Sequence, residues 1–379
     1  MRFFEKYNVL LIGFIFFTGI MGTRPLIPLL ASQLGASVAE IGVIVALYPL
    51  FPFFLAIKMG QIVDRAGYKR PIVASTFVGA LAILLPFVNA SIWSILLSQI
   101  LAGISHTVFA VSAQTLASAS KSHDEREKSI MLFSIGVALG SFLGPMLGGL
   151  FADIWDYAVA FGLLSGVSVL SACFTLFIKS DSHREATRKS TKLKQSLSLL
   201  KIKNLRVAFL VSILIILGKD IYTAYFPLLG VEFGLSDATI GFIISLNAAG
   251  GILIRWLIPY LLSNFSRTKI IMGSIVVSGV FFFALPFFES AMILAILSFI
   301  VGLGSGLGQP LSISTTADSL PQDRIGEGLG LRLTANRLTQ ISAPILFGAV
   351  AHVASVAGVF FIVGVLTVFG GTKARVPDV

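Results

Sequence analysis

Asp220 and several basic residues lie inside long apolar stretches of the chain, where a charged side chain is costly and usually has a function. Asp220 is the one carboxylate that we place well inside such a stretch, and a carboxylate can take up and release a proton. The sequence therefore favours Asp220 as a proton carrier. Arg24 lies at a similar depth, since each residue is about 15 positions, or roughly 23 Å, from the same end of its stretch.

Other polar residues in the apolar stretches predict a cavity that binds a substrate. Asn247, Gly251 and Arg255 recur every fourth residue, which places them on one face of a helix. Basic residues outnumber acidic ones along these stretches, which favours an anionic or zwitterionic substrate, although each arginine could instead pair with carbonyls or with Asp64. The residues that we assign to the cavity are Arg255, Asn247, Arg337, Gln114 and Gln309. We expect Arg332 to meet lipid headgroups or gate carboxylates instead.

His106 is a lone histidine among small residues, so both an interhelical hydrogen bond and a proton relay remain open for it. The single cysteine, Cys173, excludes an intramolecular disulfide, and we find no set of metal ligands. No ATP-binding loop is present, and we expect no cofactor. The sequence also lacks a His-x-x-Glu-His pair and a Gly-x-Ser-x-Gly elbow, which argues against an intramembrane enzyme.

The composition is that of a membrane protein with many spans. Of 379 residues, 56% are hydrophobic and only 12% are charged, and the mean hydropathy is +0.93. A soluble protein of this length would need more charge to cover its surface. With about 20 residues a span, the apolar stretches predict twelve helices, at 8–31, 38–59, 71–89, 91–117, 129–152, 155–178, 205–229, 238–262, 269–288, 290–316, 328–352 and 355–372.

The net charge of +10 follows membrane topology and does not indicate a nucleic-acid partner. The segments expected to face outward contain no Lys or Arg, whereas the alternate segments are basic, as the positive-inside rule requires. We therefore expect a multi-pass protein of the cell membrane with both termini in the cytoplasm. The outward segments are 31–40, 89–91, 153–156, 230–238, 288–290 and 353–356.

A long polar, basic linker divides the chain into two related halves. We expect an N-terminal six-helix bundle at 1–178, a cytoplasmic linker at 179–204 that could form a surface helix from Lys192 to Leu200, and a C-terminal six-helix bundle at 205–379. One offset of 199 residues aligns Pro28 with Pro227 and other pairs over more than a hundred residues. A duplicated unit with a substrate site between its halves is typical of transporters. The further pairs are Gly35 with Gly234, Ser37 with Ser236, Ile41 with Ile240, Gly42 with Gly241, Gly103 with Gly302, and Pro145 with Pro344.

Two motifs resemble those of a known family. A glycine-hinged charged loop joins the second and third predicted helices and resembles the signature loop of the major facilitator superfamily, except that Tyr68 replaces a usual basic residue. The resemblance implies that this loop locks the cytoplasmic gate. Its residues are Gly60, Asp64, Arg65, Gly67, Lys69 and Arg70. In the second half, the segment that the 199-residue offset aligns with this loop keeps only part of the motif, with Ser263 in place of Asp64.

The fifth predicted helix carries a row of small residues that looks like the motif of the drug/proton antiporter branch of this superfamily. Small residues one turn apart allow close helix packing, which alone could explain the row. The branch usually has an arginine in the fourth helix, where this chain has Gln99. The row consists of Gly140, Gly144, Pro145, Gly148 and Gly149.

The resemblance implies a secondary active transporter that works by alternating access. We expect efflux of small amphipathic compounds driven by protons, with uptake or exchange of an anionic metabolite as the alternative. Because helices 1 and 7 meet in this family, Asp220 and Arg24 could also form a structural ion pair, and His106 belongs to the same candidate coupling group. The expected partners are a small-molecule substrate, protons and the lipid bilayer, and we expect a monomer.

Overall fold

The computed structural model describes residues 2–118, 123–178, 199–321 and 324–375, and every regular element in these ranges is a helix. Ten of these helices are long and apolar enough to span a membrane. The apolar segment Val38–Phe54 adds another, and one very long helix divides at Ser355, where φ is 69°. The described residues thus confirm the predicted all-α membrane fold with twelve spans.

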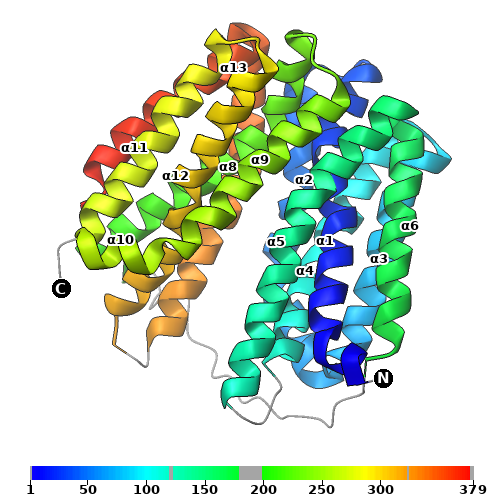
Figure 1. Cartoon of the computed structure of the whole chain (residues 1–379), viewed down its shortest axis with the longest axis horizontal. Helices are drawn as coiled ribbons and strands as arrows, with labels where there is room; N and C mark the ends of the chain where they lie inside the picture. The colour runs from blue at the N-terminus through cyan, green and yellow to red at the C-terminus, as the bar shows by residue number, and fades with distance from the viewer. Residues whose placement is uncertain (1, 119–122, 179–198, 322–323, 376–379) are drawn as a thin grey trace. The chain divides into compact units, whose positions relative to one another are not determined.

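The described helices form two compact units, which we name the N-terminal and C-terminal units. The N-terminal unit holds the first six helices and also residues 234–245, and the C-terminal unit holds the remaining described residues. The sequence-based domain boundaries remain a prediction. The helices of the N-terminal unit are α1 (Arg2–Gln33), α2 (Val38–Ala66), α3 (Lys69–Val88), α4 (Ile92–Ala117), α5 (His123–Ile154) and α6 (Tyr157–Leu176) (Figure 1).

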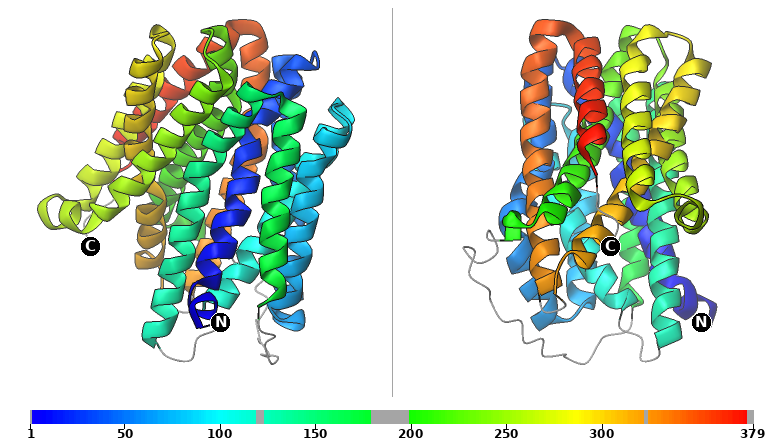
Figure 2. Two further views of the ribbon diagram at one scale, coloured as in Figure 1. Left: turned by 45° about the vertical axis from the view of Figure 1, so that its right-hand side comes forward. Right: turned by 90° about the vertical axis from the view of Figure 1, so that its left-hand side faces the viewer.

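After these helices the chain continues with a short 3-10 turn and the helices of the second half (Figure 1). In order they are η1 (Leu199–Lys201), α8 (Lys203–Glu232), α9 (Asp237–Trp256), α10 (Ile258–Asn264), α11 (Arg267–Ala284), η2 (Leu285–Phe287), α12 (Ala291–Asp318) and α13 (Ile325–Lys373). The predicted surface helix from 192 to 200 lies mostly outside the described residues. Figure 2 shows the chain reversing its direction within α13, between the orange and the red segments.

Helix ends recur in the two halves with the same chemistry. Gly35 and Gly234 precede α2 and α9 with φ of 85° and 71°, a backbone region that glycine enters without steric cost. Ser37 then caps α2, because its Oγ accepts the N–H of Glu40 while the Glu40 carboxylate accepts the N–H of Ser37. Ser236 accepts the N–H of Thr239 in the same way before α9. These paired turns support the internal repeat.

Two predicted boundaries were wrong for local reasons. The helix predicted at 38–59 continues to Ala66, so Gly60, Asp64 and Arg65 belong to the last turns of α2, and the turn itself begins at Gly67 with φ of 72°. The segment from residue 59 to residue 66 contains no proline, and a single glycine lowers helix propensity by only about 1 kcal/mol, so the helix continues through it. The helix predicted at 238–262 divides after Trp256, because Pro259 has no backbone N–H to donate and starts a new helix, α10.

Close helix contacts repeat with the same offset. A Cβ on Gly103 of α4 would overlap the carbonyl of Tyr48 in α2, and a Cβ on Gly302 of α12 would overlap the carbonyl of Asn247 in α9. Tyr48 and Asn247, like the two glycines, are 199 residues apart. Both units therefore bring the second and fourth helices of their half together at one glycine, where the backbones touch.

Candidate functional site

In the N-terminal unit the structure brings together Arg24 and His106 through a residue that the sequence analysis missed. The Arg24 guanidinium lies 4.3 Å from the centroid of the Tyr48 ring, a cation–π geometry. The His106 ring lies 5.7 Å from the same ring and 5.2 Å from that of Phe17. His106 is three residues from Gly103, so the glycine contact between α2 and α4 places it beside Tyr48. A cation and a proton-accepting imidazole thus share one aromatic neighbour.

In the C-terminal unit a pocket opens among α8, α9, α11, α12 and α13. Its lining is apolar apart from the polar residues Lys219, Tyr222, Asn247, Ser278, Ser305 and Thr367. Asn247 donates from Nδ2 to the Ser298 carbonyl at 2.8 Å. Its cavity volume of about 10 Å³ has room for about one water molecule, so in this conformation it is a small polar gap between helices and not an open substrate site.

The pocket is the repeat counterpart of the aromatic cluster in the other unit. The offset of 199 residues carries Tyr48 to Asn247 and His106 to Ser305. The repeat was therefore a sequence signal that could have found Tyr48. Next to the pocket residue Lys219, Asp220 is buried in α8 with 7% of its surface exposed.

A second polar cluster in the C-terminal unit joins α8, α12 and α13. One Nη of Arg332 donates to Ser212 Oγ and to Gln309 Oε1, each at 2.9 Å. Ser212 Oγ donates to Asn336 Oδ1 at 2.7 Å, and the Gln309 amide donates to Ser212 at 3.3 Å. We name these four residues the Arg332 cluster. Arg332 is only 4% exposed, so the expectation that it meets headgroups was wrong: its neighbours on α8 and α12 enclose it.

Three residues assigned to the cavity do not join these clusters. Arg255, at the exposed end of α9, donates from Nε to the Gly306 carbonyl at 3.3 Å, as the alternative of carbonyl pairing anticipated. Arg337 donates to Gln340 one turn further along α13, at 3.0 Å. Gln114 is exposed near the end of α4. Their assignment to a substrate cavity remains a prediction.

The signature loop is described only in part. The side chains of Gly60, Asp64 and Arg65 lie outside the described residues, so their assignment to the gate remains a prediction. Tyr68 is buried directly before α3, which begins at Lys69, and Arg70 is exposed in the first turn of α3.

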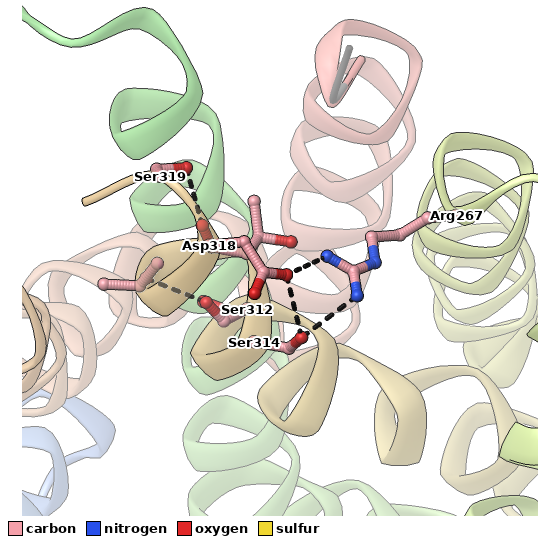
Figure 3. A network of polar contacts seen from close by, with 7 residues as sticks. Arg267, Ser312, Ser314, Asp318 and Ser319 are labelled. Atoms are coloured by element: carbon pink, nitrogen blue, oxygen red, sulfur yellow. Dashed lines mark hydrogen bonds and ion pairs between the residues drawn. The ribbon is translucent and has the colours of Figure 1, made fainter. Parts of the chain in front are cut away.

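The counterpart of this loop in the second half contains an ion pair. Arg267, at the start of α11, pairs with Asp318 at the end of α12, and both contact Ser314, at 3.0 and 3.2 Å (Figure 3). The offset carries Arg267 to Tyr68, the position where the first loop lacks a basic residue. Near the same end of α12, Ser312 donates to the Ala208 carbonyl of α8 and Ser319 donates to the Thr315 carbonyl of α12 (Figure 3).

The small-residue row of α5 packs against α1, and the two helices run side by side in Figures 1 and 2. A Cβ on Gly140, Gly144 or Gly148 would overlap α1 backbone between Phe14 and Gly22. Gly149 and Pro145 instead touch the first turns of α9, at Asp237 and Gly241. Each glycine of the row therefore removes a steric barrier to one of two neighbouring helices.

The sequence matches the family model of the Major Facilitator Superfamily over residues 9–261 and 208–376. The chain belongs to this superfamily. It is therefore a multi-pass membrane protein and a secondary transporter, and the superfamily consists of transporters, not enzymes.

Relatives of similar length match nearly the whole transporter. An uncharacterised MFS-type transporter of Methanocaldococcus jannaschii is 24% identical over 93% of both chains. Quinolone resistance protein NorA of Staphylococcus aureus is 22% identical over 93% of this chain and 91% of its own length. The class G tetracycline resistance protein of Vibrio anguillarum is 24% identical over 86% of this chain and 84% of its own.

Solved structures share the fold at low identity. A D323A mutant of the nucleoside transporter NupG superposes with a TM-score of 0.84 and 14% identity, covering 97% of this chain and 98% of its own. A bacterial homologue of the human lysosomal transporter Spinster, in an inward-facing and unoccupied conformation, gives 0.79 and 13%, covering 99% and 95%. These likenesses establish the fold and leave the substrate open.

Proposed function

We propose that this transporter exports small amphipathic compounds from the cell in exchange for protons, by alternating access, as a monomer with both termini in the cytoplasm. The observation that carries the proton coupling is Asp220, a carboxylate that is 7% exposed within a spanning helix. Burying a carboxylate within a spanning helix is energetically unfavourable, so such a residue usually has a function. A change in its protonation alters the charge of α8.

Support for export comes from two sources. Relatives named for quinolone and tetracycline resistance match the chain over most of its length. The small-residue row of α5, which resembles the antiporter motif, lies against α1 and the start of α9 at backbone contact. The α1–α5 contact lies within the first six-helix half, where close packing suits the rigid-body movement of a half in alternating access.

We assign Arg24 and His106 to the same coupling step as Asp220. Arg24 supplies a positive charge held on the Tyr48 ring, and His106 supplies a second group able to carry a proton. The gate residues Asp64, Arg65, Lys69 and Arg70, with the turn glycines Gly60 and Gly67, close the cytoplasmic side in this proposal. Asn247 and Gln309, in the pocket and in the Arg332 cluster, contact the substrate.

The test measures proton release from inside-out vesicles on addition of a panel of lipophilic cations and organic anions. Substrate-triggered proton movement in the wild type that Asp220→Asn loses is the expected result. Asp156→Asn is the matched control, because Asp156 only caps α6 by accepting the Val159 N–H at 2.7 Å, which an asparagine can also accept. Proton movement retained in Asp220→Asn would remove Asp220 from the coupling role.

A second candidate is uptake or exchange of an anionic metabolite. It is favoured by Arg24, Arg255 and Arg337, which are basic residues within spanning helices. The two functions predict opposite changes in the accumulation of a test compound when cells that carry the protein are compared with cells that lack it. Lower accumulation supports export, and higher accumulation of an organic anion supports uptake.

A further inference from the structure

In the described part of the chain, the Arg332 guanidinium donates hydrogen bonds from one of its edges and none from the other. Both of its hydrogen bonds come from a single Nη, to Ser212 and Gln309. Nε is buried and donates to no described residue, and the second Nη makes no hydrogen bond in the described part of the chain but keeps some exposed surface. These two nitrogens form the fork with which arginine binds a carboxylate through two parallel hydrogen bonds.

The positive charge of Arg332 is also uncompensated within the described residues. No described carboxylate lies within ion-pair distance of Arg332. A buried charge without a counter-ion is costly. The side-chain nitrogen of Asn336, one turn further along α13, is a further donor without a described acceptor. The cluster thus offers a charge and three unused donor atoms.

The fold itself does not require an arginine at this position. In the N-terminal unit the same repeat positions are occupied by Gly13 and Phe133, and the Phe133 ring fills the space beside the glycine. Phe133 is 6% exposed, so an apolar side chain satisfies the equivalent site. Since apolar residues can replace buried ionic groups without loss of stability, the arginine needs a reason other than packing.

The cluster lies well inside the helices that carry it. Ser212 is nine residues from the start of α8, and Gln309 is nine residues from the end of α12. At 1.5 Å per residue both are about 14 Å from the nearer helix end, in helices that are roughly 45 and 42 Å long. A ligand held there lies inside the spanning helices, about a third of the way along each of them.

We propose that the Arg332 cluster binds the carboxylate group of an amphipathic substrate, with the free fork of Arg332 as its main contact and Asn336 as a second donor. The inference rests on the proposed transport function and narrows its substrate class to compounds that bear a carboxylate. The planar fork matches a carboxylate with two hydrogen bonds, whereas a neutral amide offers one acceptor and no charge.

The test measures equilibrium binding of 1-naphthylacetate and 4-phenylbutyrate, each against its own carboxamide, to the full-length protein in nanodiscs of zwitterionic lipid by isothermal titration calorimetry. The wild type is expected to bind at least one acid about tenfold or more tightly than its amide. Arg332→Gln should bind acid and amide equally, and Arg332→Lys, which keeps the charge but loses the fork, should keep only part of the preference.

Arg375→Gln and Arg375→Lys are the matched controls, because Arg375 is exposed after the end of α13 and its side chain makes no hydrogen bond or ion pair with described residues. If Arg332→Gln fails to fold, the preference for acid over amide is compared between Arg332→Lys and the wild type. Equal binding of acid and amide by the wild type, or a full preference retained in the folded Arg332 variants, would overturn the inference.

This measurement needs no proton gradient, so its failure is separate from failure of the proposed function. A preference for the acids without substrate-triggered proton movement would keep the carboxylate site and reject proton-coupled export. Proton-coupled export of lipophilic cations with no preference for the acids would reject the carboxylate site alone.

Discussion

The N-terminal and C-terminal units repeat the same helix contacts but place different chemistry at equivalent positions. Tyr48 and Gly103 meet in one unit as Asn247 and Gly302 meet in the other. Around these shared contacts, the aromatic partner of His106 becomes an amide in a pocket, and the apolar Phe133 becomes Arg332. The backbone contacts determine how the helices of each unit cross, and the side chains beside these contacts differ between the two units.

The same division holds between the third and fourth helices of each half. Ser105 of α4 donates to the Ser75 carbonyl at 2.7 Å and lies against Gly79 of α3. In the second half the small partner has moved to the other helix, since Gly304 of α12 lies against Ser278 of α11. What the repeat preserves is therefore the small combined volume at the crossing and not the identity of either residue.

The largest expected effect is from Phe133→Arg, which copies the C-terminal residue into the N-terminal unit. Gly13 supplies none of the acceptors that Ser212 supplies to Arg332, so the new charge is buried without a partner. We expect a loss of about 3–5 kcal/mol of stability. The reciprocal Arg332→Phe should stay within about 1 kcal/mol of the wild type. Thermal unfolding in one detergent measures both, and equal losses would contradict the comparison.

Enlarging the paired crossing glycines should damage both units alike. Gly103→Leu and Gly302→Leu each force a side chain into the backbone of the neighbouring helix, with an expected cost of about 1–3 kcal/mol or more. Gly166→Leu is the control, because a Cβ at Gly166 has no atom within 4 Å. Fluorescence-detected size-exclusion chromatography after heating reports the loss. A stable Gly302→Leu beside an unstable Gly103→Leu would show that the repeat does not extend to packing.

Removing the two helix caps should lower stability by smaller and unequal amounts. Ser37→Ala removes an Oγ that accepts the Glu40 N–H and donates to the charged Glu40 carboxylate, whereas Ser236→Ala removes an Oγ that accepts the Thr239 N–H and shares a hydrogen bond with the neutral Thr239 hydroxyl. We expect a loss of about 1 kcal/mol for the first and less for the second. Melting temperatures measured side by side check the order, with Ser37→Asp as a variant that keeps the capping oxygen.

The smallest expected effect is from the ion pair that the second loop has and the first lacks. Arg267→Gln removes a partly exposed pair with Asp318, which contributes about 0.5–1 kcal/mol at most. The effect should fall as salt rises, because exposed charges are screened. Lys269→Gln, on the exposed surface of the same helix, is the control. A loss that does not depend on salt would assign Arg267 a packing role instead.

Some site residues could be found from the sequence because charge in an apolar stretch is visible there. Asp220, Arg24 and Gln309 stand out against apolar neighbours, and the structure gives each a buried or partnered position. Tyr48, Ser212 and Asn336 were missed, because a tyrosine or a serine is ordinary in a membrane helix. Only the contacts of Tyr48 with Arg24, of Ser212 with Arg332, and of Asn336 with Ser212 distinguish them.

The sequence alone determined the membrane class, the twelve spans and the twofold repeat, because hydropathy, glycine turns and offsets are local or periodic properties of the chain. For Arg332 it predicted contact with lipid headgroups or gate carboxylates, and it assigned this residue to no site. Tertiary structure decided where each polar side chain of a helix lies, since the face that a residue presents depends on which neighbours pack against it. Ser212 and Gln309 enclose Arg332 from two other helices, and that arrangement, not the position of Arg332 in the sequence, buries its charge.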